Sequence, residues 1–94
     1  MVVHIRLPQA LAMDAGGVVE LSMEVVDGGT LADLLEELGA RHPALTRRLC
    51  DETGRIRRFV NIYLDADESR SLRGLATPLH EGVHILVVGS VAGG

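Results

Sequence analysis

The sequence contains no lysine and no tryptophan, and both absences limit what the chain can do. All nine basic residues are arginine. If the C-terminal carboxylate of one copy were activated as an acyl group, it would find no lysine amine on another copy. Lysine-linked chains of this protein are therefore excluded. Phe59 and Tyr63 are the only aromatic residues, and the formal net charge is −4. With so few rings for bases to stack on and an excess of acid, we expect no binding to nucleic acid.

Long apolar runs and paired cysteines are missing as well. No run approaches the roughly 18 apolar residues that a membrane-spanning helix needs, so we expect no membrane span. Residues 1–6 lack the basic start and the long apolar stretch of a signal peptide. The single cysteine, Cys50, has no partner for an internal disulfide, which suits a reducing compartment. We therefore expect a cytoplasmic protein.

The chain does have enough aliphatic material for one small domain. It has 94 residues, of which 47% are hydrophobic, so it can fold around an aliphatic core. Residues 2–7, from Val3 onward, and residues 18–25, from Val19 onward, alternate apolar and polar side chains, as strands with one buried face do. We expect these two strands to form a hairpin, with residues 9–17 as the loop between them.

One amphipathic helix follows the break at residues 27–29. Thr30 is a favourable N-cap, and Asp33 lies in the first turn, where a negative charge suits the helix dipole. His42 precedes Pro43 and is disfavoured in the α conformation, so the helix should end there. Residues 44–50 suggest a short second helix. The apolar face of the main helix comprises Leu31, Leu34, Leu35 and Leu38.

The second half of the chain supplies further strands. Residues 59–64 are rich in β-forming side chains, and residues 83–88 are an apolar run that follows a turn at 81–82. An acidic turn at 65–69 and an irregular stretch at 71–78 lie between them. This order predicts an α+β domain in which a mixed sheet of four to five strands packs on one main helix. The opposite face of the sheet is left partly open and is a natural docking surface.

The chain ends in Val91-Ala92-Gly93-Gly94, soon after the last predicted strand. We expect a folded domain over residues 1–88 and a flexible tail over residues 89–94. Because glycine has no Cβ, such a tail can pass through a narrow channel and deliver the Gly94 carboxylate into another protein's active site. A frayed terminus without a function is the alternative.

Four segments carry a family resemblance: residues 58–63 (Arg-Phe-Val-Asn-Ile-Tyr), 74–79 (Gly-Leu-Ala-Thr-Pro-Leu), 81–82 (Glu-Gly) and 91–94 (Val-Ala-Gly-Gly). Together they resemble the small ubiquitin-like sulfur carrier proteins of the ThiS/MoaD/CysO group, which have the β-grasp fold. The first two segments look most similar to CysO-type carriers, which hand sulfur to cysteine biosynthesis. One departure is Gly89-Ser90, where members of the group usually have a proline.

The resemblance implies a cycle of chemistry at the C-terminus. An E1-like adenylating and sulfurtransferase enzyme would use ATP to convert the Gly94 carboxylate to an acyl-adenylate. Sulfide or a persulfide would then displace AMP and leave a thiocarboxylate, with the tail residues Val91, Ala92 and Gly93 threaded into the partner. The chain would be a protein cosubstrate for a sulfur-accepting biosynthetic enzyme, for example a cysteine synthase. It would not itself be an enzyme, and it would bind no cofactor or metal.

Other functions stay open beside this one. Among carriers, the small subunit of molybdopterin synthase and a sulfur donor for another biosynthetic pathway are alternatives to the CysO-type role, which we favour. A ubiquitin-like modifier that forms isopeptides on other proteins would use the same Gly-Gly ending. A non-catalytic interaction module with an incidental tail is the last candidate, and for it removal of Gly94 should change nothing.

Several patterns suggest other sites but favour simpler interpretations. Residues 80–84 match the His-Glu-x-x-His pattern of zinc proteases, yet Pro78 before them and Gly82 within them favour a turn into a strand. Cys50 follows two arginines and could be a reactive thiol, but a small core residue near a helix end is the favoured interpretation.

A basic cluster and an aromatic residue lie just before the third predicted strand. Arg55, Arg57 and Arg58 could bind phosphate or an acidic partner surface, although a solvated strand edge is the commoner case. Phe59 belongs either to the core or to the docking face, and we favour the docking face.

Overall fold

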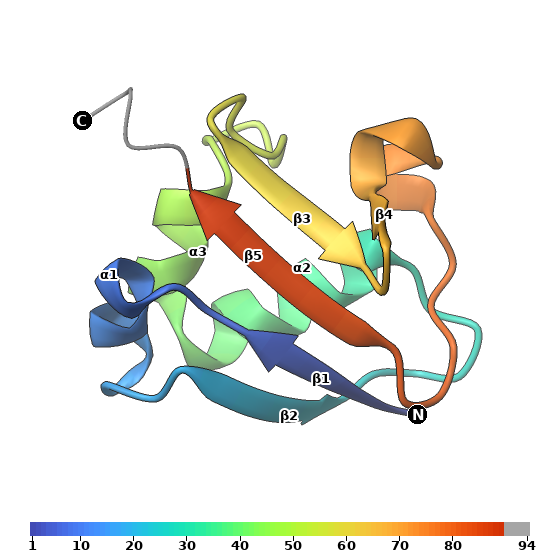
Figure 1. The fold of residues 1–94 in the computed structure, drawn as a ribbon, viewed down its shortest axis with the longest axis horizontal. Coiled ribbons are helices and arrows are strands. Elements are labelled where there is room, and N and C mark those ends of the chain that lie inside the picture. Colours follow the sequence, from blue (N-terminus) through green and yellow to red (C-terminus); the bar gives the residue numbers. More distant parts are fainter. Residues whose placement is uncertain (90–94) are drawn as a thin grey trace.

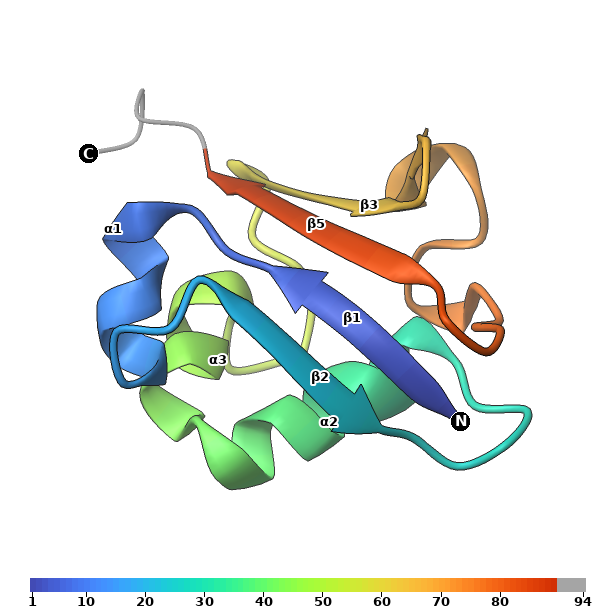
Figure 2. The same ribbon diagram turned by 60° about the horizontal axis from the view of Figure 1, so that its bottom comes forward.

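The computed structural model describes residues 1–89, which form one mixed sheet covered by helices on one face (Figures 1 and 2). The sheet order is β2-β1-β5-β3-β4, with β1 and β5 parallel and the other neighbours antiparallel. The predicted α+β architecture is confirmed. The strands are β1 (Val2–Arg6), β2 (Glu20–Glu24), β3 (Val60–Leu64), β4 (Asp67–Glu68) and β5 (His84–Gly89), and the helices are α1 (Gln9–Ala12), α2 (Leu31–Arg41) and α3 (Pro43–Leu49).

The last strand, β5, lies at the centre of the sheet. It pairs in parallel with β1 on one side and antiparallel with β3 on the other, where Val60 is opposite Gly89. Strand β5 thus reaches Gly89, one residue beyond the predicted strand end at Val88. The rest of the predicted tail, residues 90–94, lies outside the described residues. The central position of β5 anchors the point from which the chain continues towards Gly94.

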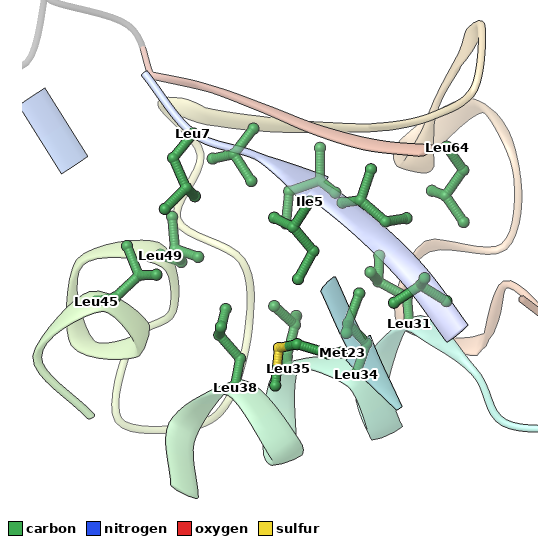
Figure 3. Close-up of a cluster of buried hydrophobic side chains, with 14 of the residues drawn as sticks. Ile5, Leu7, Met23, Leu31, Leu34, Leu35, Leu38, Leu45, Leu49 and Leu64 are labelled. Atoms are coloured by element: carbon green, nitrogen blue, oxygen red, sulfur yellow. The ribbon is translucent and has the colours of Figure 1, made fainter. Parts of the chain in front are cut away.

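Helix α2 begins and ends where the sequence predicts. The Asp33 carboxylate accepts hydrogen bonds from the backbone N–H of Thr30 at 2.8 Å and from its hydroxyl at 3.2 Å, as part of a capping box. At the other end the His42 N–H donates to the Leu38 carbonyl at 2.7 Å, and Pro43 starts α3 immediately. The four predicted leucines of the apolar face are all buried and point from α2 into the core (Figure 3).

The segment predicted as a loop over residues 9–17 is mostly helical, and that prediction was wrong. It forms α1 and a 3₁₀ turn at Met13–Ala15, ended by Gly16 in the left-handed conformation with φ 71°. Leu11 and Ala15 are buried in the core, while Asp14 forms an ion pair of 3.3 Å with Arg48 of α3. Tertiary packing against α3 therefore stabilises a helix that is too short to show a periodic pattern. Within residues 1–89 the helical layer contains three α-helices rather than one main helix and a short second one.

The core between sheet and helices is aliphatic, as predicted. Leucines from α2 and α3 meet β-strand residues such as Ile5 and Met23 (Figure 3), and neither aromatic residue is among the buried side chains. None of the helices in residues 1–89 is long and apolar enough to cross a membrane. The largest fully buried apolar side chains are Val3, Leu31, Leu34, Leu38, Leu45, Leu49, Ile62 and Val83.

Candidate functional site

The tail residues that the sequence marks most strongly, Val91, Ala92, Gly93 and Gly94, lie outside the described residues. The structure describes the end of the sheet from which they follow. There Gly89 pairs with Val60, so the last described residue belongs to the hydrogen-bonded ladder. The starting point of the tail is therefore held by the central strand of the sheet.

Gly89, together with Ser90, stands where members of the ThiS/MoaD/CysO group usually have a proline. The surroundings of Gly89 do not require a glycine. A Cβ placed on it would meet no atom within 4 Å, and its φ is not in the left-handed region. Neither packing nor backbone geometry therefore demands glycine at this position. What glycine supplies is added backbone freedom at the last paired residue of β5.

The sheet face opposite the helices is open, as predicted, and its apolar part lies near the end of β5. Alternation along this strand buries Ile85 and Val87 and leaves Leu86 39% and Val88 38% exposed. The sequence reasoning did not single out these two exposed residues. The sequence did contain a signal for them. A strand covered on only one face needs apolar residues only at alternate positions, yet every position from 85 to 88 is apolar.

Phe59 lies in a turn just before β3, at the same end of the sheet. The turn is closed by a hydrogen bond of 2.9 Å from the Val60 N–H to the Arg57 carbonyl. Phe59 is 42% exposed, so it is not a core residue, and its role in docking stays a prediction. Arg55 and Arg58 are exposed on the same loop, whereas Arg57 is half-buried.

Two histidines meet on the open face beside this apolar area. His4 of β1 and His84 of β5 are register partners, and their rings stack with centroids 5.2 Å apart. The His4 Nδ1 atom lies 3.1 Å from the Ser22 hydroxyl. The open face is therefore mixed, with polar residues over β1 and β2 and apolar residues towards the end of β5.

The His-Glu-x-x-His pattern is confirmed as a turn into a strand. His80 lies in the turn, and its Nε2 atom is 3.0 Å from an oxygen of Asp65. His84 begins β5, and its backbone N–H donates to the other Asp65 oxygen at 3.1 Å. Within residues 1–89, no group of three or more histidine, cysteine, aspartate or glutamate side chains is arranged to hold a metal ion.

The His80–Asp65 pair makes folding stability depend on pH. Hydrogen bonds to the Glu81 carbonyl and to Asp65 raise the pKa of His80 above 6.5, and the His84 N–H together with His80 lowers the pKa of Asp65 below 3.8. The His80 contribution is full below pH 6.5 and is lost as pH rises through the raised pKa. The Asp65 contribution is present above pH 3.8 and is lost as pH falls through the lowered pKa.

Replacement of His80 by glutamine should therefore lower the melting temperature more at about pH 5.5 than at about pH 8.5. The pair is exposed, so the difference will be small. Thermal unfolding followed by circular dichroism at both pH values tests this, with Ser71→Ala as a surface control. Equal shifts at the two pH values would show that the ion pair does not form.

Cys50 is a structural residue, as favoured. It is 7% exposed and belongs to the core cluster. Burial, followed by the charge of Asp51, raises the pKa of its thiol. Because the thiolate is the nucleophilic form, this environment suppresses reactivity.

We expect the Cys50 thiol to react with a disulfide reagent at least about tenfold more slowly in the folded protein than in denaturant. Release of the coloured thiolate under both conditions measures this directly. A free thiol of a small peptide at the same pH is the reference. A native rate equal to that of the peptide would mean that the thiol is accessible.

The sheet order, with β5 at the centre, and the helices on one face allow the fold to be compared with known structures. The crystal structure of CysO from Mycobacterium tuberculosis matches with a TM-score of 0.83 and 31% identity, covering 95% of this chain and 99% of that chain. This chain is thus a ubiquitin-like β-grasp domain. The ThiS family model matches residues 10–94, and the chain belongs to the ThiS family.

The proteins similar to this chain include sulfur carriers and a small archaeal modifier protein. The curated sulfur carrier protein CysO of Mycobacterium tuberculosis is 33% identical over 96 residues, which covers all of both chains. Small archaeal modifier protein 3 of Haloferax volcanii is 36% identical over 70 residues, covering 74% of this chain and 75% of that one. A chain of the BexX/CysO complex of Amycolatopsis orientalis matches with a TM-score of 0.82 and 28% identity, covering 98% of this chain and 99% of that chain.

Proposed function

We propose that this protein is a sulfur carrier that works through its Gly94 carboxylate. An E1-like enzyme adenylates the carboxylate with ATP and releases pyrophosphate. Sulfide then displaces AMP and leaves a thiocarboxylate, which donates its sulfur to a biosynthetic enzyme. If a persulfide displaces AMP instead, the product is an acyl disulfide, and a second thiol releases the thiocarboxylate from it as a disulfide forms. The carrier is a protein cosubstrate, and ATP is used by its partner rather than bound by the carrier itself.

The observation that carries this proposal is the match to CysO over the whole of both chains. It is joined by the family match, which extends to Gly94. A match restricted to the sheet and helices would support only a shared fold, whereas this one includes the Gly-Gly ending.

The described part of the chain suits a carrier in two respects. Its core is densely aliphatic, and the residue before the tail is held in the centre of the sheet. A domain of this kind presents its C-terminal segment from a fixed point, which reduces the entropy lost when a partner takes the tail. The open face with Leu86 and Val88 offers a surface that a partner can cover at the same time.

Cysteine biosynthesis is the pathway we favour, because the curated sulfur carrier protein CysO matches this chain over the full length of both. The sulfur-accepting partner would then be a cysteine synthase. The complex of a CysO chain with BexX supports docking of such carriers on a partner protein. The small subunit of molybdopterin synthase and donors for other pathways remain alternatives within the same chemistry.

A ubiquitin-like modifier is the second candidate, favoured by the similarity to small archaeal modifier protein 3. Both functions begin with adenylation of the terminal glycine. They differ in the nucleophile that takes the activated acyl group of Gly94. For a carrier it is a sulfur atom, and for a modifier it is a lysine amine on another protein. The lack of lysine in this chain is compatible with both.

Intact-mass spectrometry separates the candidates. The chain is incubated with an E1-like enzyme, ATP and a sulfide source, and the C-terminal peptide is then sequenced by fragmentation. We expect a mass gain confined to that peptide and equal to replacement of one oxygen by sulfur. Omission of ATP is the matched control.

Failure of loading with several such enzymes, together with isopeptide conjugates in cells, would place the modifier first. Transfer of the sulfur to a cysteine synthase, followed as loss of the added mass, tests the pathway separately.

A further inference from the structure

The loop between α3 and β3, residues 50–59, carries three arginines within four positions. In the described part of the chain, Arg6, Arg41, Arg48 and Arg70 each form an ion pair with a carboxylate. None of the ion pairs formed within residues 1–89 involves the loop arginines. Arg57 is instead committed to the fold, because its Nε donates to the Arg47 carbonyl at 3.1 Å. Arg55 and Arg58 are left exposed and available.

The loop is held in shape by hydrogen bonds to the carboxylate of Asp51, its first acidic residue. The Asp51 carboxylate accepts from the Thr53 hydroxyl at 2.6 Å, the Thr53 N–H at 2.9 Å and the Arg55 N–H at 3.1 Å. These hydrogen bonds lower the pKa of Asp51. Further backbone bonds join Asp51 to Arg55 and Arg57 to Leu49. The arginines therefore stand on an ordered loop, and a partner need not pay the entropy of ordering it.

The loop lies at the end of the sheet from which the tail follows. Val60, the residue after Phe59, pairs with Gly89, and Figure 1 shows the segment before β3 beside the end of β5. A shallow cleft there is lined by Asp51, Arg55, Ile56, Arg57, Arg58 and Phe59. A protein that binds the chain where it leaves β5 approaches this end of the sheet.

The charges of the chain favour approach by this end. Carboxylates gather at the opposite end of the sheet, where β5 begins: Asp65 and Asp67 follow β3, Glu24 ends β2 and Glu81 precedes β5. The loop itself has three arginines against the two carboxylates Asp51 and Glu52, a net charge of +1 in a chain whose formal net charge is −4. Such polarity orients a small protein with its tail end towards a negative surface and speeds encounter with it.

We propose that Arg55, Arg58 and Phe59 form a docking surface for the activating enzyme, which presents carboxylates around an apolar pocket at the mouth of its tail channel. This surface rests on the proposed sulfur-carrier function and names the chemistry of its first partner. The guanidinium groups pair with the partner's carboxylates, and the Phe59 ring fills the pocket between them.

Steady-state kinetics of adenylation by the E1-like enzyme test the surface. The double variant Arg55→Glu/Arg58→Glu should raise the KM for the carrier at least about tenfold and leave kcat within about twofold, because docking is weakened while the reacting carboxylate is unchanged. Arg73→Glu, an exposed arginine on the segment before β5, is the matched control and should leave KM unchanged. High salt should raise the wild-type KM towards that of the double variant.

Phe59→Ala gives an independent arm. It should raise KM about three- to tenfold, and this ratio to wild type should not shrink with salt. Thermal unfolding of every variant confirms that the domain is intact. Wild-type kinetics in both arms, or an Arg73→Glu effect as large as that of the double variant, would overturn the docking surface.

Direct binding of the same variants to the enzyme without ATP separates the two proposals. Activation of the wild type without any effect of the variants removes the docking surface and leaves the carrier function intact. Absence of both binding and activation of the wild type removes both. A loss of binding seen only with the sulfur-accepting enzyme also overturns the assignment to the activating enzyme.

Discussion

Removal of Gly94, or addition of one residue after it, is expected to abolish sulfur loading while the domain stays folded. The reacting carbonyl must sit within bonding distance of the α-phosphate of ATP in the activating enzyme. A displacement of one residue moves it by about 3.3 Å, and even about 1 Å of misplacement can cost a hundredfold in rate. The expected signal is complete absence of the thiocarboxylate mass, with an unchanged melting temperature.

The extended chain also carries its own control. If a protease that removes the added residue is supplied, loading should return to the wild-type level. Loading of the extended chain without trimming would contradict a mechanism that depends on the terminal carboxylate. An interaction module with an incidental tail would show no difference between any of these chains.

Gly93→Val tests the channel while chain length is kept. A β-branched side chain next to the reacting glycine should block adenylation, because the tail is expected to pass through a passage sized for glycine. Pyrophosphate exchange with the activating enzyme measures this step before any sulfur chemistry. Exchange at the wild-type rate would show that the channel is wide enough for a branched residue.

The sequence predicts the main helix and the sheet well because each has a strong local signal. Thr30 and Asp33 mark the helix start, and Pro43 marks its end, so the bounds of α2 follow from residue chemistry alone. Helix α1 escapes prediction because it has only four residues. Its stability comes from burial of Leu11 and neighbouring alanines against α3, a contact that is invisible in local sequence.

Some features of the candidate site can likewise be read from the local sequence, whereas others depend on the tertiary structure. The Gly-Gly ending is a local pattern and can be recognised in the sequence, as can the arginine cluster. The location of Phe59 depends on a turn between a loop and β3, and the same residue one position later would have been buried like Val60. The sequence does not show which of the three arginines is held by the fold. Only the hydrogen bonds across the loop distinguish Arg57 from the exposed Arg55 and Arg58.

Leu38→Ala should cost about 2–5 kcal/mol of unfolding free energy. Leu38 is 1% exposed and points from α2 into the core (Figure 3). Alanine keeps the helix propensity high, so the loss reflects the cavity and the apolar surface rather than the backbone. For a domain with a total stability of about 5–15 kcal/mol, this change would remove a large share of it.

Leu72→Ala is the matched substitution at the surface, because Leu72 is 41% exposed. It removes the same atoms but leaves no closed cavity, so we expect a change of at most about 0.5–1 kcal/mol. Urea unfolding of both variants followed by circular dichroism gives the two free energies on one scale. A similar small change for both would contradict the position of Leu38 in the core. A large change for Leu38 alone would show that the leucine face of α2, rather than aliphatic content in general, stabilises the sheet that carries the tail.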